Sequence, residues 1–140
     1  MLRRTSIGLL LLTFFSITSC QRQNNNIPLV IVDVYININN PSYFQLQAVG
    51  GWTYVTGGSK GLIVYRYSVD EFRVYDRHST YLPENECIVS VDTSDNLTIE
   101  DACSGSRWII TDGSVIQVPA TFPLQGYQSS FDGQIIHIYN

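Results

Sequence analysis

The chain has 140 residues and a formal net charge of −4 at pH 7, from 8 Lys and Arg against 12 Asp and Glu. This length is enough for one compact domain with a hydrophobic core but too short for two. An acidic chain without a cluster of basic residues is poorly suited to nucleic acid or to anionic lipid headgroups, so the composition argues against both kinds of partner.

The N-terminus carries the features of a secretory signal peptide. Arg3 and Arg4 precede an apolar run from Ile7 to Phe15, which is shorter than the roughly 20 apolar residues that cross a bilayer as a helix. The residues that follow, Ser-Ile-Thr-Ser-Cys, resemble a bacterial lipobox, in which cleavage occurs before a lipid-modified cysteine. We therefore predict a signal peptide over 1–19, lipidated Cys20 with a polar tether over 20–27, and one β domain over 28–140. The alternative is a secreted protein without lipid, in which Cys20 is incidental.

Lipid on Cys20 would also set the location of the protein. Two or three acyl chains hold a protein firmly on a membrane, so we expect a bacterial cell envelope, with the domain in the periplasm or outside the cell. The residue after the cysteine is Gln21 and not the aspartate that retains enterobacterial lipoproteins in the inner membrane. This favours the outer membrane.

The rest of the chain shows the two-residue period of β-strands. Between 30 and 38, Val30, Val32, Val34, Ile36 and Ile38 fill every second position. Further strands are predicted over 51–56, 62–67, 72–76, 88–91, 107–111 and 134–139. The pairs Asp112-Gly113 and Asp132-Gly133 lie between apolar runs and suit two-residue hairpin turns. No helical stripe follows the signal peptide, so the fold class expected is all-β, an antiparallel sandwich or small barrel.

Two loops resemble the cluster-binding loops of the Rieske iron-sulfur domain family. The first is Asp76-Arg77-His78-Ser79-Thr80-Tyr81, and the second is Asp101-Ala102-Cys103-Ser104-Gly105-Ser106. In that family the first loop carries CxH and the second CxxH, because two thiolates hold one iron and two imidazoles the other. The resemblance assigns these four ligand positions to residues that are neither Cys nor His, namely Ser79, Tyr81, Asp101 and Ser104.

The resemblance covers about 90 residues, and its matching segments lie between residues 58 and 127. Residues 58–66 and 72–77 are similar to the family's approach to its first loop. After the second loop come an aromatic residue, a DG turn and a proline segment, in the family's order, at Trp108, Asp112-Gly113 and 119–124. Val118 replaces the glycine of the family's GPA sequence. The resemblance implies a Rieske-like antiparallel β domain with a loop-rich subdomain of the cluster-binding type, kept after the ligands were lost.

Cysteine usage indicates one disulfide. If Cys20 carries lipid, Cys87 and Cys103 remain in a compartment that permits disulfides, and two such cysteines most simply pair. By the resemblance, Cys103 matches the middle cysteine of the family's CPCHGS sequence, which forms a disulfide in the quinol-oxidising members. Their partner cysteine lies at the place of Glu84, whereas Cys87 lies further along. A bond between Cys87 and Cys103 would tie the two loops together.

Three kinds of chemistry are alternatives to the loss of the cluster. Improvised cluster ligands would be His78, His137, Cys87 and Cys103, but a disulfide would leave no thiolate for iron. A mononuclear metal site would use His78, Asp101 and Cys103, whose spacing is not that of structural zinc sites. A hydrolase triad would use Asp76, His78 and Ser79, yet neighbouring residues of an extended segment point to opposite sides. We therefore predict no catalytic residue, no metal site and no cofactor.

The nine tyrosines raise a separate question. They could line a glycan- or protein-binding face, but tyrosine also suits half-buried strands with its hydroxyl in water, and we favour this structural role. The function predicted from the sequence is a cluster-free envelope lipoprotein that is no enzyme and serves as a binding or assembly component with an envelope protein partner. The alternatives are a 2Fe-2S electron-transfer protein and a subunit of a membrane redox complex.

Overall fold

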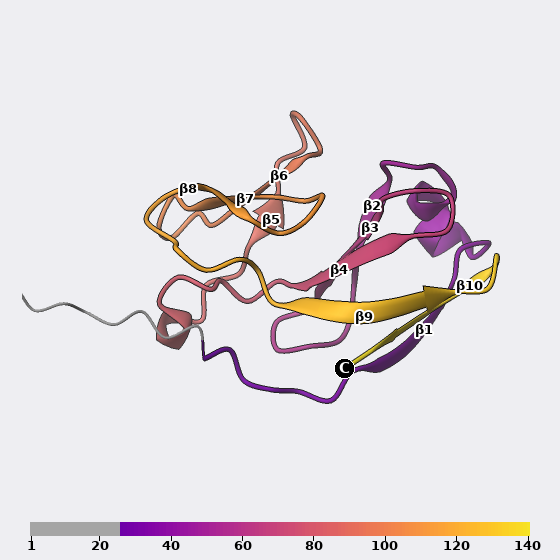
Figure 1. Cartoon of the computed structure of the whole chain (residues 1–140), viewed down its shortest axis with the longest axis horizontal. Coiled ribbons are helices and arrows are strands. Elements are labelled where there is room, and N and C mark those ends of the chain that lie inside the picture. Colours follow the sequence, from indigo (N-terminus) through magenta and orange to yellow (C-terminus); the bar gives the residue numbers. More distant parts are fainter. Residues whose placement is uncertain (1–25) are drawn as a thin grey trace, which may run out of the picture.

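The computed structural model describes residues 26–140, so the predicted signal peptide, Cys20 and most of the tether lie outside the described residues. Within residues 26–140, no helix is long and apolar enough to cross a membrane. Ten strands and two short 3-10 helices follow one another along the chain (Figure 1): β1 (Asp33–Asn37), η1 (Pro41–Gln47), β2 (Trp52–Val55), β3 (Leu62–Arg66), β4 (Phe72–Asp76), η2 (Pro83–Asn85), β5 (Ser90–Val91), β6 (Thr98–Glu100), β7 (Arg107–Ile109), β8 (Val115–Gln117), β9 (Gly126–Phe131) and β10 (Ile135–Tyr139).

The larger sheet has six antiparallel strands in the order β1-β10-β9-β4-β3-β2. Its inner face forms the first core, in which β1 and β10 pack against β3 and β4. The sheet therefore wraps around its own core, as a sandwich or partial barrel does. The residues of this core are Val32, Ile36, Ile38, Leu46, Val55, Leu62, Val64, Phe72, Val74, Ile136 and Ile138.

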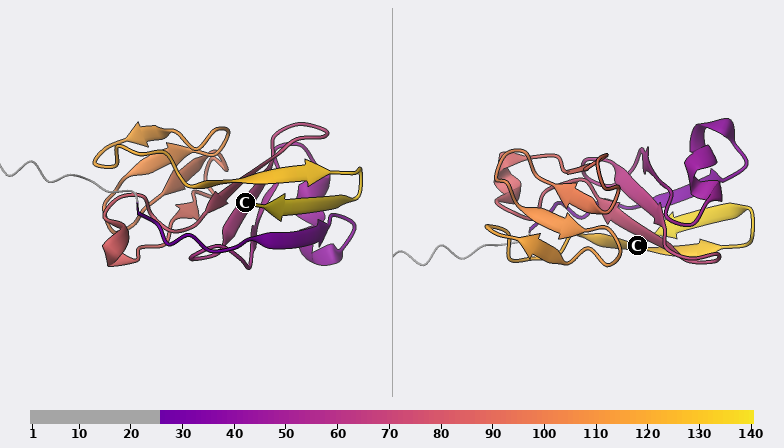
Figure 2. Two further views of the ribbon diagram at one scale, coloured as in Figure 1. Left: turned by 60° about the horizontal axis from the view of Figure 1, so that its bottom comes forward. Right: turned by 90° about the horizontal axis from the view of Figure 1, so that it is seen from above.

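The smaller sheet has four antiparallel strands in the order β5-β6-β7-β8 and lies at the other end of the long axis (Figures 1 and 2). Its core includes Ile99, Trp108 and Ile110, and it also contains Ile63 and Tyr75 from the outer face of β3 and β4. The strands β3 and β4 are thus covered on both faces. This explains why Leu62–Arg66 is buried at every position and shows no alternation.

The predicted all-β antiparallel class, with a smaller loop-rich subdomain, is confirmed. Strands occur in each of the predicted segments, with ends that differ by a few residues. The first strand begins at Asp33 and not at Val30, because Asp33 pairs with Tyr139, where β10 ends. Upstream of it, the Asn140 side chain accepts from Val32 N and donates to Val30 O.

Three strands were not predicted: β6, β8 and β9. The first two have three residues each, which is too short for a recognisable period. The third reads GYQSSF, and its Gly, Ser and Gln residues are weak strand formers. Both predicted DG turns do join neighbouring strands, β7 to β8 and β9 to β10, although the connecting segments exceed two residues.

Candidate functional site

The first loop leaves the larger sheet after β4 and returns to β5. His78 forms an antiparallel bridge with Ile88, and the base of the loop is closed by Ser79 N, which donates to Cys87 O at 2.9 Å. The helix η2 lies within this loop, between β4 and β5. Ser79 is therefore fixed at the base of the loop, and its side chain is buried.

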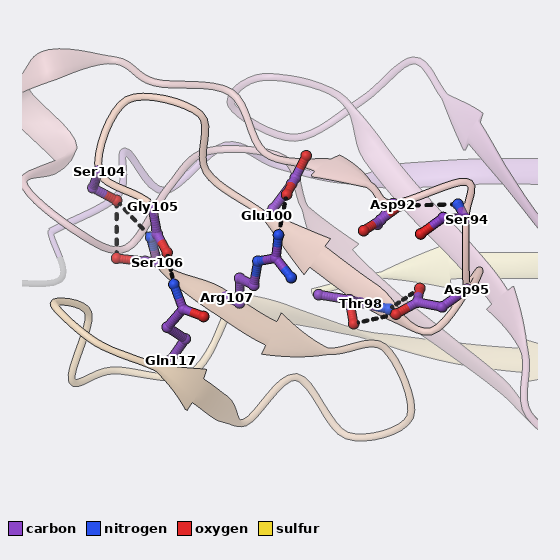
Figure 3. A network of polar contacts seen from close by, with 10 residues as sticks. All are labelled: Asp92, Ser94, Asp95, Thr98, Glu100, Ser104, Gly105, Ser106, Arg107 and Gln117. Atoms are coloured by element: carbon purple, nitrogen blue, oxygen red, sulfur yellow. Dashed lines mark hydrogen bonds and ion pairs between the residues drawn. The ribbon is translucent and has the colours of Figure 1, made fainter.

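The second loop leaves the smaller sheet after β6 and returns at β7. Its backbone turns tightly, because Gly105 N donates to Asp101 O at 2.8 Å and Asp101 N donates to Ser106 O at 3.0 Å. The hydroxyl oxygens of Ser104 and Ser106 are hydrogen-bonded to each other at 2.9 Å, and Gln117 on β8 donates to Gly105 O at 2.8 Å (Figure 3). These bonds hold the loop against the smaller sheet.

The two loops meet at the carboxylate of Asp101, which is 1% exposed. Its Oδ2 atom accepts hydrogen bonds from Ser79 Oγ and from Ser104 Oγ, each at 2.8 Å. Its Oδ1 atom accepts from Cys103 N at 2.9 Å. Three of the four positions that the sequence assigned to cluster ligands are thus joined by hydrogen bonds in one buried network.

The fourth position, Tyr81, takes part through its backbone. Tyr81 N donates to Ser79 Oγ at 3.2 Å, and its partly buried ring packs against the second core. The structure therefore brings all four predicted positions together at one place between the two loops.

A disulfide joins Cys87 of the first loop to Cys103 of the second, with a Cα–Cα distance of 6.4 Å. This confirms the predicted pairing. It lies beside the carboxylate, since ligand atoms of Cys87, Asp101 and Cys103 all fall within 4.8 Å of one another. Among the described residues, these three form the group whose atoms are close enough to share a metal ion. The group does not include His78, which belonged to the mononuclear site that the sequence analysis considered and rejected.

His78 has a different set of partners from those that a metal or a triad would need. Its Nδ1 atom lies 2.8 Å from Ser59 Oγ, and its Nε2 atom lies 2.8 Å from Pro83 O. A carbonyl only accepts, so Nε2 carries the proton and Nδ1 accepts from Ser59 in the neutral ring. The imidazole thus links η2 to the segment before β3, and its bonded partner is Ser59 in place of Ser79.

His137 lies on the larger sheet, away from the two loops. Its neighbours Ile136 and Ile138 are fully buried, whereas the imidazole is partly exposed and lies 2.8 Å from Asp33 Oδ1. It stacks on Tyr35 with 4.2 Å between ring centroids. The prediction that His137 points away from the two isoleucines is confirmed.

Asp76 organises the approach to the first loop, a role that the sequence analysis missed. The carboxylate is fully buried and accepts four hydrogen bonds, from Ser59 N at 2.6 Å, Lys60 N at 3.2 Å, His78 N at 2.8 Å and Tyr127 Oη at 2.8 Å. Gly58 adopts a φ of +61° beside it, and a side chain there would meet the carboxylate. The glycine-rich run before β3 was the available signal, because such a run lets backbone N–H groups converge on an anion.

Comparison with known proteins gave structural similarity alone. No family model matches the chain, and no curated protein matches it. Among solved structures, it is similar to the ferredoxin of carbazole 1,9a-dioxygenase from Nocardioides aromaticivorans IC177, with 18% identity and a TM-score of 0.46 over 79% of this chain and 98% of that chain. It is also similar to the Sphingomonas yanoikuyae B1 ferredoxin, with 21% identity and a TM-score of 0.49 over 78% and 99% of the two chains.

A third similar structure is a complex of reduced oxygenase and oxidised ferredoxin in carbazole 1,9a-dioxygenase. Its identity is 22% and its TM-score 0.46, over 64% of this chain and 81% of that chain. At these values the similarity concerns the fold alone.

Proposed function

We propose that this protein is a cluster-free domain of the Rieske type that acts as a non-catalytic binding or assembly component. The single observation that carries the proposal is the buried network around Asp101. Where the resemblance puts iron ligands, Ser79 and Ser104 instead donate hydrogen bonds to a carboxylate. The bond from Ser79 joins the first loop to the second, and the bond from Ser104 fixes the carboxylate within the second loop, so the loops are held together without a metal cluster.

The chemistry of the donor set also supports the absence of a 2Fe-2S cluster. The oxygen atoms of Ser79, Tyr81, Asp101 and Ser104 are hard ligands, whereas sulfide-bridged iron favours thiolates and imidazoles. Both nearby sulfur atoms are consumed in the Cys87–Cys103 bond. Both nitrogen atoms of His78 are engaged with Ser59 and Pro83. The residues present therefore do not fit a 2Fe-2S cluster.

The location in the cell is part of the same proposal. Lipid on Cys20 would anchor the protein to a bacterial envelope membrane, with the outer membrane favoured, and would place the domain beside other envelope proteins. Its partner would be one of these proteins. Labelling with a radioactive or alkyne fatty acid tests the anchor, since a Cys20→Ala variant should lose the label that the native chain takes up.

The decisive experiment is a cofactor assay on the full-length protein, produced anaerobically in a host with ample capacity for iron-sulfur assembly. We expect folded protein with neither stoichiometric iron nor acid-labile sulfide, and no Rieske-type paramagnetic resonance signal after reduction. Stoichiometric iron and sulfide with that signal would overturn the proposal and make the protein an electron carrier.

A matched variant tests whether the loops keep the geometry of a cluster site. It combines Ser79→Cys, Tyr81→His, Asp101→Cys and Ser104→His, which restore the family's ligands at the four positions. Cluster uptake by this variant and not by the native chain would indicate that the native residues, and not the shape of the loops, exclude the cluster.

A further inference from the structure

The smaller sheet covers only part of the outer face of the larger sheet. On this face, Tyr75 of β4 pairs with Gly126 of β9, and alternation puts Arg73 and Gln128 on the same side. Gln128 in turn pairs with Tyr139 of β10. Tyr75 is buried under the smaller sheet, whereas Gln128 and Tyr139 are exposed. The border between covered and open surface therefore runs along β4 and β9, which lie side by side in Figures 1 and 2.

A groove of about 650 Å³ follows this border. Its floor is formed by β4 and β9, and Asp112, from the segment between β7 and β8, contributes to its wall. Gly126 supplies no side chain beside Tyr75, and a Cβ atom built there would meet nothing closer than Val74 O at 3.7 Å. Gly113, with a φ of +75°, lies directly against the Tyr75 ring, where a Cβ would come within 2.7 Å. Gly126 thus keeps the groove open, and Gly113 lets the smaller sheet pack closely against Tyr75.

Two polar atoms in the residues that line this groove lack a partner. Among the described residues, Arg73 Nε and Tyr75 Oη are the buried side-chain polar atoms without a hydrogen bond. Tyr75 is 4% exposed, and its burial raises the pKa of the hydroxyl well above the ordinary value, so the proton stays on the oxygen. An unpaired buried donor is costly, and a ligand that accepts hydrogen bonds would relieve that cost.

The charges at the groove select the kind of acceptor. Arg73 is its one cation, and Arg73 Nη2 is already paired with Glu71 at 2.8 Å. Asp70, Glu71 and Asp112 make the lining acidic overall, which disfavours a carboxylate, sulfate or phosphate ligand. A neutral polyol has hydroxyl groups that both donate to carboxylates and accept from Arg73 Nε and Tyr75 Oη, so it matches this mixture of groups.

Aromatic rings lie on the same outer face as the groove, beside β4 at the end of β3 and beside β9 on β10. Tyr67, 43% exposed, is held by the Arg73 guanidinium at 4.7 Å from its ring centroid. On the other side, Tyr139 packs beside His137, and His137 stacks on Tyr35, which is 65% exposed. Each ring is fixed on one side by a neighbour. Held aromatic rings of this kind provide flat apolar surface for the carbon-bound hydrogens of a sugar ring.

From this arrangement we propose that the groove between β4 and β9 binds a neutral oligosaccharide, with Tyr75 and Arg73 as hydrogen-bond donors and Tyr67 and Tyr139 as flanking stacking surfaces. The proposal does not depend on whether the two loops hold a cluster, because the groove lies on the larger sheet. Iron and sulfide analysis therefore tests the function proposed above, and carbohydrate binding tests this one.

The test uses the full-length protein in detergent and isothermal titration with four neutral hexasaccharides of glucose or N-acetylglucosamine: cellohexaose, maltohexaose, isomaltohexaose and chitohexaose. Hexagalacturonate serves as the anionic comparison. Three variants accompany the native chain. Gly126→Leu fills the groove, at a position where the backbone accepts a side chain, Tyr75→Phe removes only the unpaired hydroxyl, and Tyr43→Phe is the matched control, because Tyr43 packs against the first core.

We expect at least one neutral hexasaccharide to bind in about the micromolar to millimolar range. Gly126→Leu should abolish this binding, Tyr75→Phe should weaken it about fivefold through the lost hydrogen bond, and Tyr43→Phe should leave it unchanged. The proposal is overturned if none of the four neutral probes binds at millimolar concentration, if Gly126→Leu binds like the native chain, or if hexagalacturonate binds more tightly than every neutral probe. Circular dichroism of each variant confirms that it is folded before titration.

Discussion

Replacing Cys87 and Cys103 by serine should lower the stability of the domain by an amount that follows from the loop they close. The two residues are separated by 16 positions. For a loop of this length, the chain-entropy model gives about 3 kcal/mol at 25 °C. A domain of this size loses about 4 °C of Tm per kcal/mol, so the double variant should melt about 12 °C lower. Urea denaturation followed by tryptophan fluorescence measures the change in the free energy of unfolding.

The same loss should follow when the native chain is reduced with dithiothreitol, because Cys103 is exposed and open to the reductant. The reduced native chain and the double serine variant are therefore matched controls for each other. If both unfold at the same urea concentration as the oxidised native chain, the disulfide does not hold the loops. The hydrogen bond from Ser79 to Asp101 would then be sufficient to hold the two loops together.

Three further predictions concern the buried carboxylate of Asp76, the hydroxyls of Tyr75 and Tyr127, and the surface carboxylate of Asp112. Asp76→Ala should destabilise the domain by about 4 kcal/mol in urea denaturation, because the four hydrogen bonds to its buried carboxylate are lost. A change below about 1 kcal/mol would contradict the conclusion that Asp76 holds the approach to the first loop in place. Burial raises the pKa of Tyr75 and of Tyr127, whose hydroxyl also donates to Asp76. Absorbance at 295 nm should therefore show tyrosines that ionise only when alkali unfolds the chain. The contribution of these two groups to the free energy of unfolding is fully present below the ordinary tyrosine pKa of 10.0 and falls as the pH rises above it. Hydrogen bonds from Ser114 lower the pKa of Asp112. Their contribution to the stability of the folded chain is therefore fully present above the unfolded value of 3.8 and is lost at more acid pH. Ser114→Ala should lower the urea midpoint at pH 7 but not at pH 2.

How far the sequence predicted the fold depended on local pattern. Val32, Ile36 and Ile38 alternate with exposed residues, and β1 was predicted because this two-residue period is visible without any partner strand. The strand β9 was missed because GYQSSF owes its structure to its neighbours, β4 on one side and β10 on the other. A short or polar strand gains its stability from cross-strand partners, which local sequence does not reveal.

The candidate site divides in the same way. The motif spacing was enough to select Ser79, Tyr81, Asp101 and Ser104 as the positions that the resemblance assigns to cluster ligands. The number of cysteines was enough to pair Cys87 with Cys103. The spacing gave no indication that Asp101 would be buried between two serine hydroxyls, because that depends on how closely the first loop approaches the second. The pairing of His78 with Ser59 was not predicted either, and neither were three of the four bonds of Asp76, since their donors, Ser59, Lys60 and Tyr127, lie elsewhere in the chain.

The sequence by itself therefore determined which residues the chain has for chemistry. They are oxygen donors at the four positions that the resemblance assigns to cluster ligands, and one pair of cysteines in the described domain. These are properties of residue type and order, and folding does not change them. Only the tertiary structure decided which groups meet. It joined the two loops at Asp101, and it left Tyr75 Oη and Arg73 Nε buried without a partner. These two residues line a groove where the smaller sheet stops short of covering the larger one. Contacts of this kind depend on how two sheets pack, and packing is set by the whole chain at once.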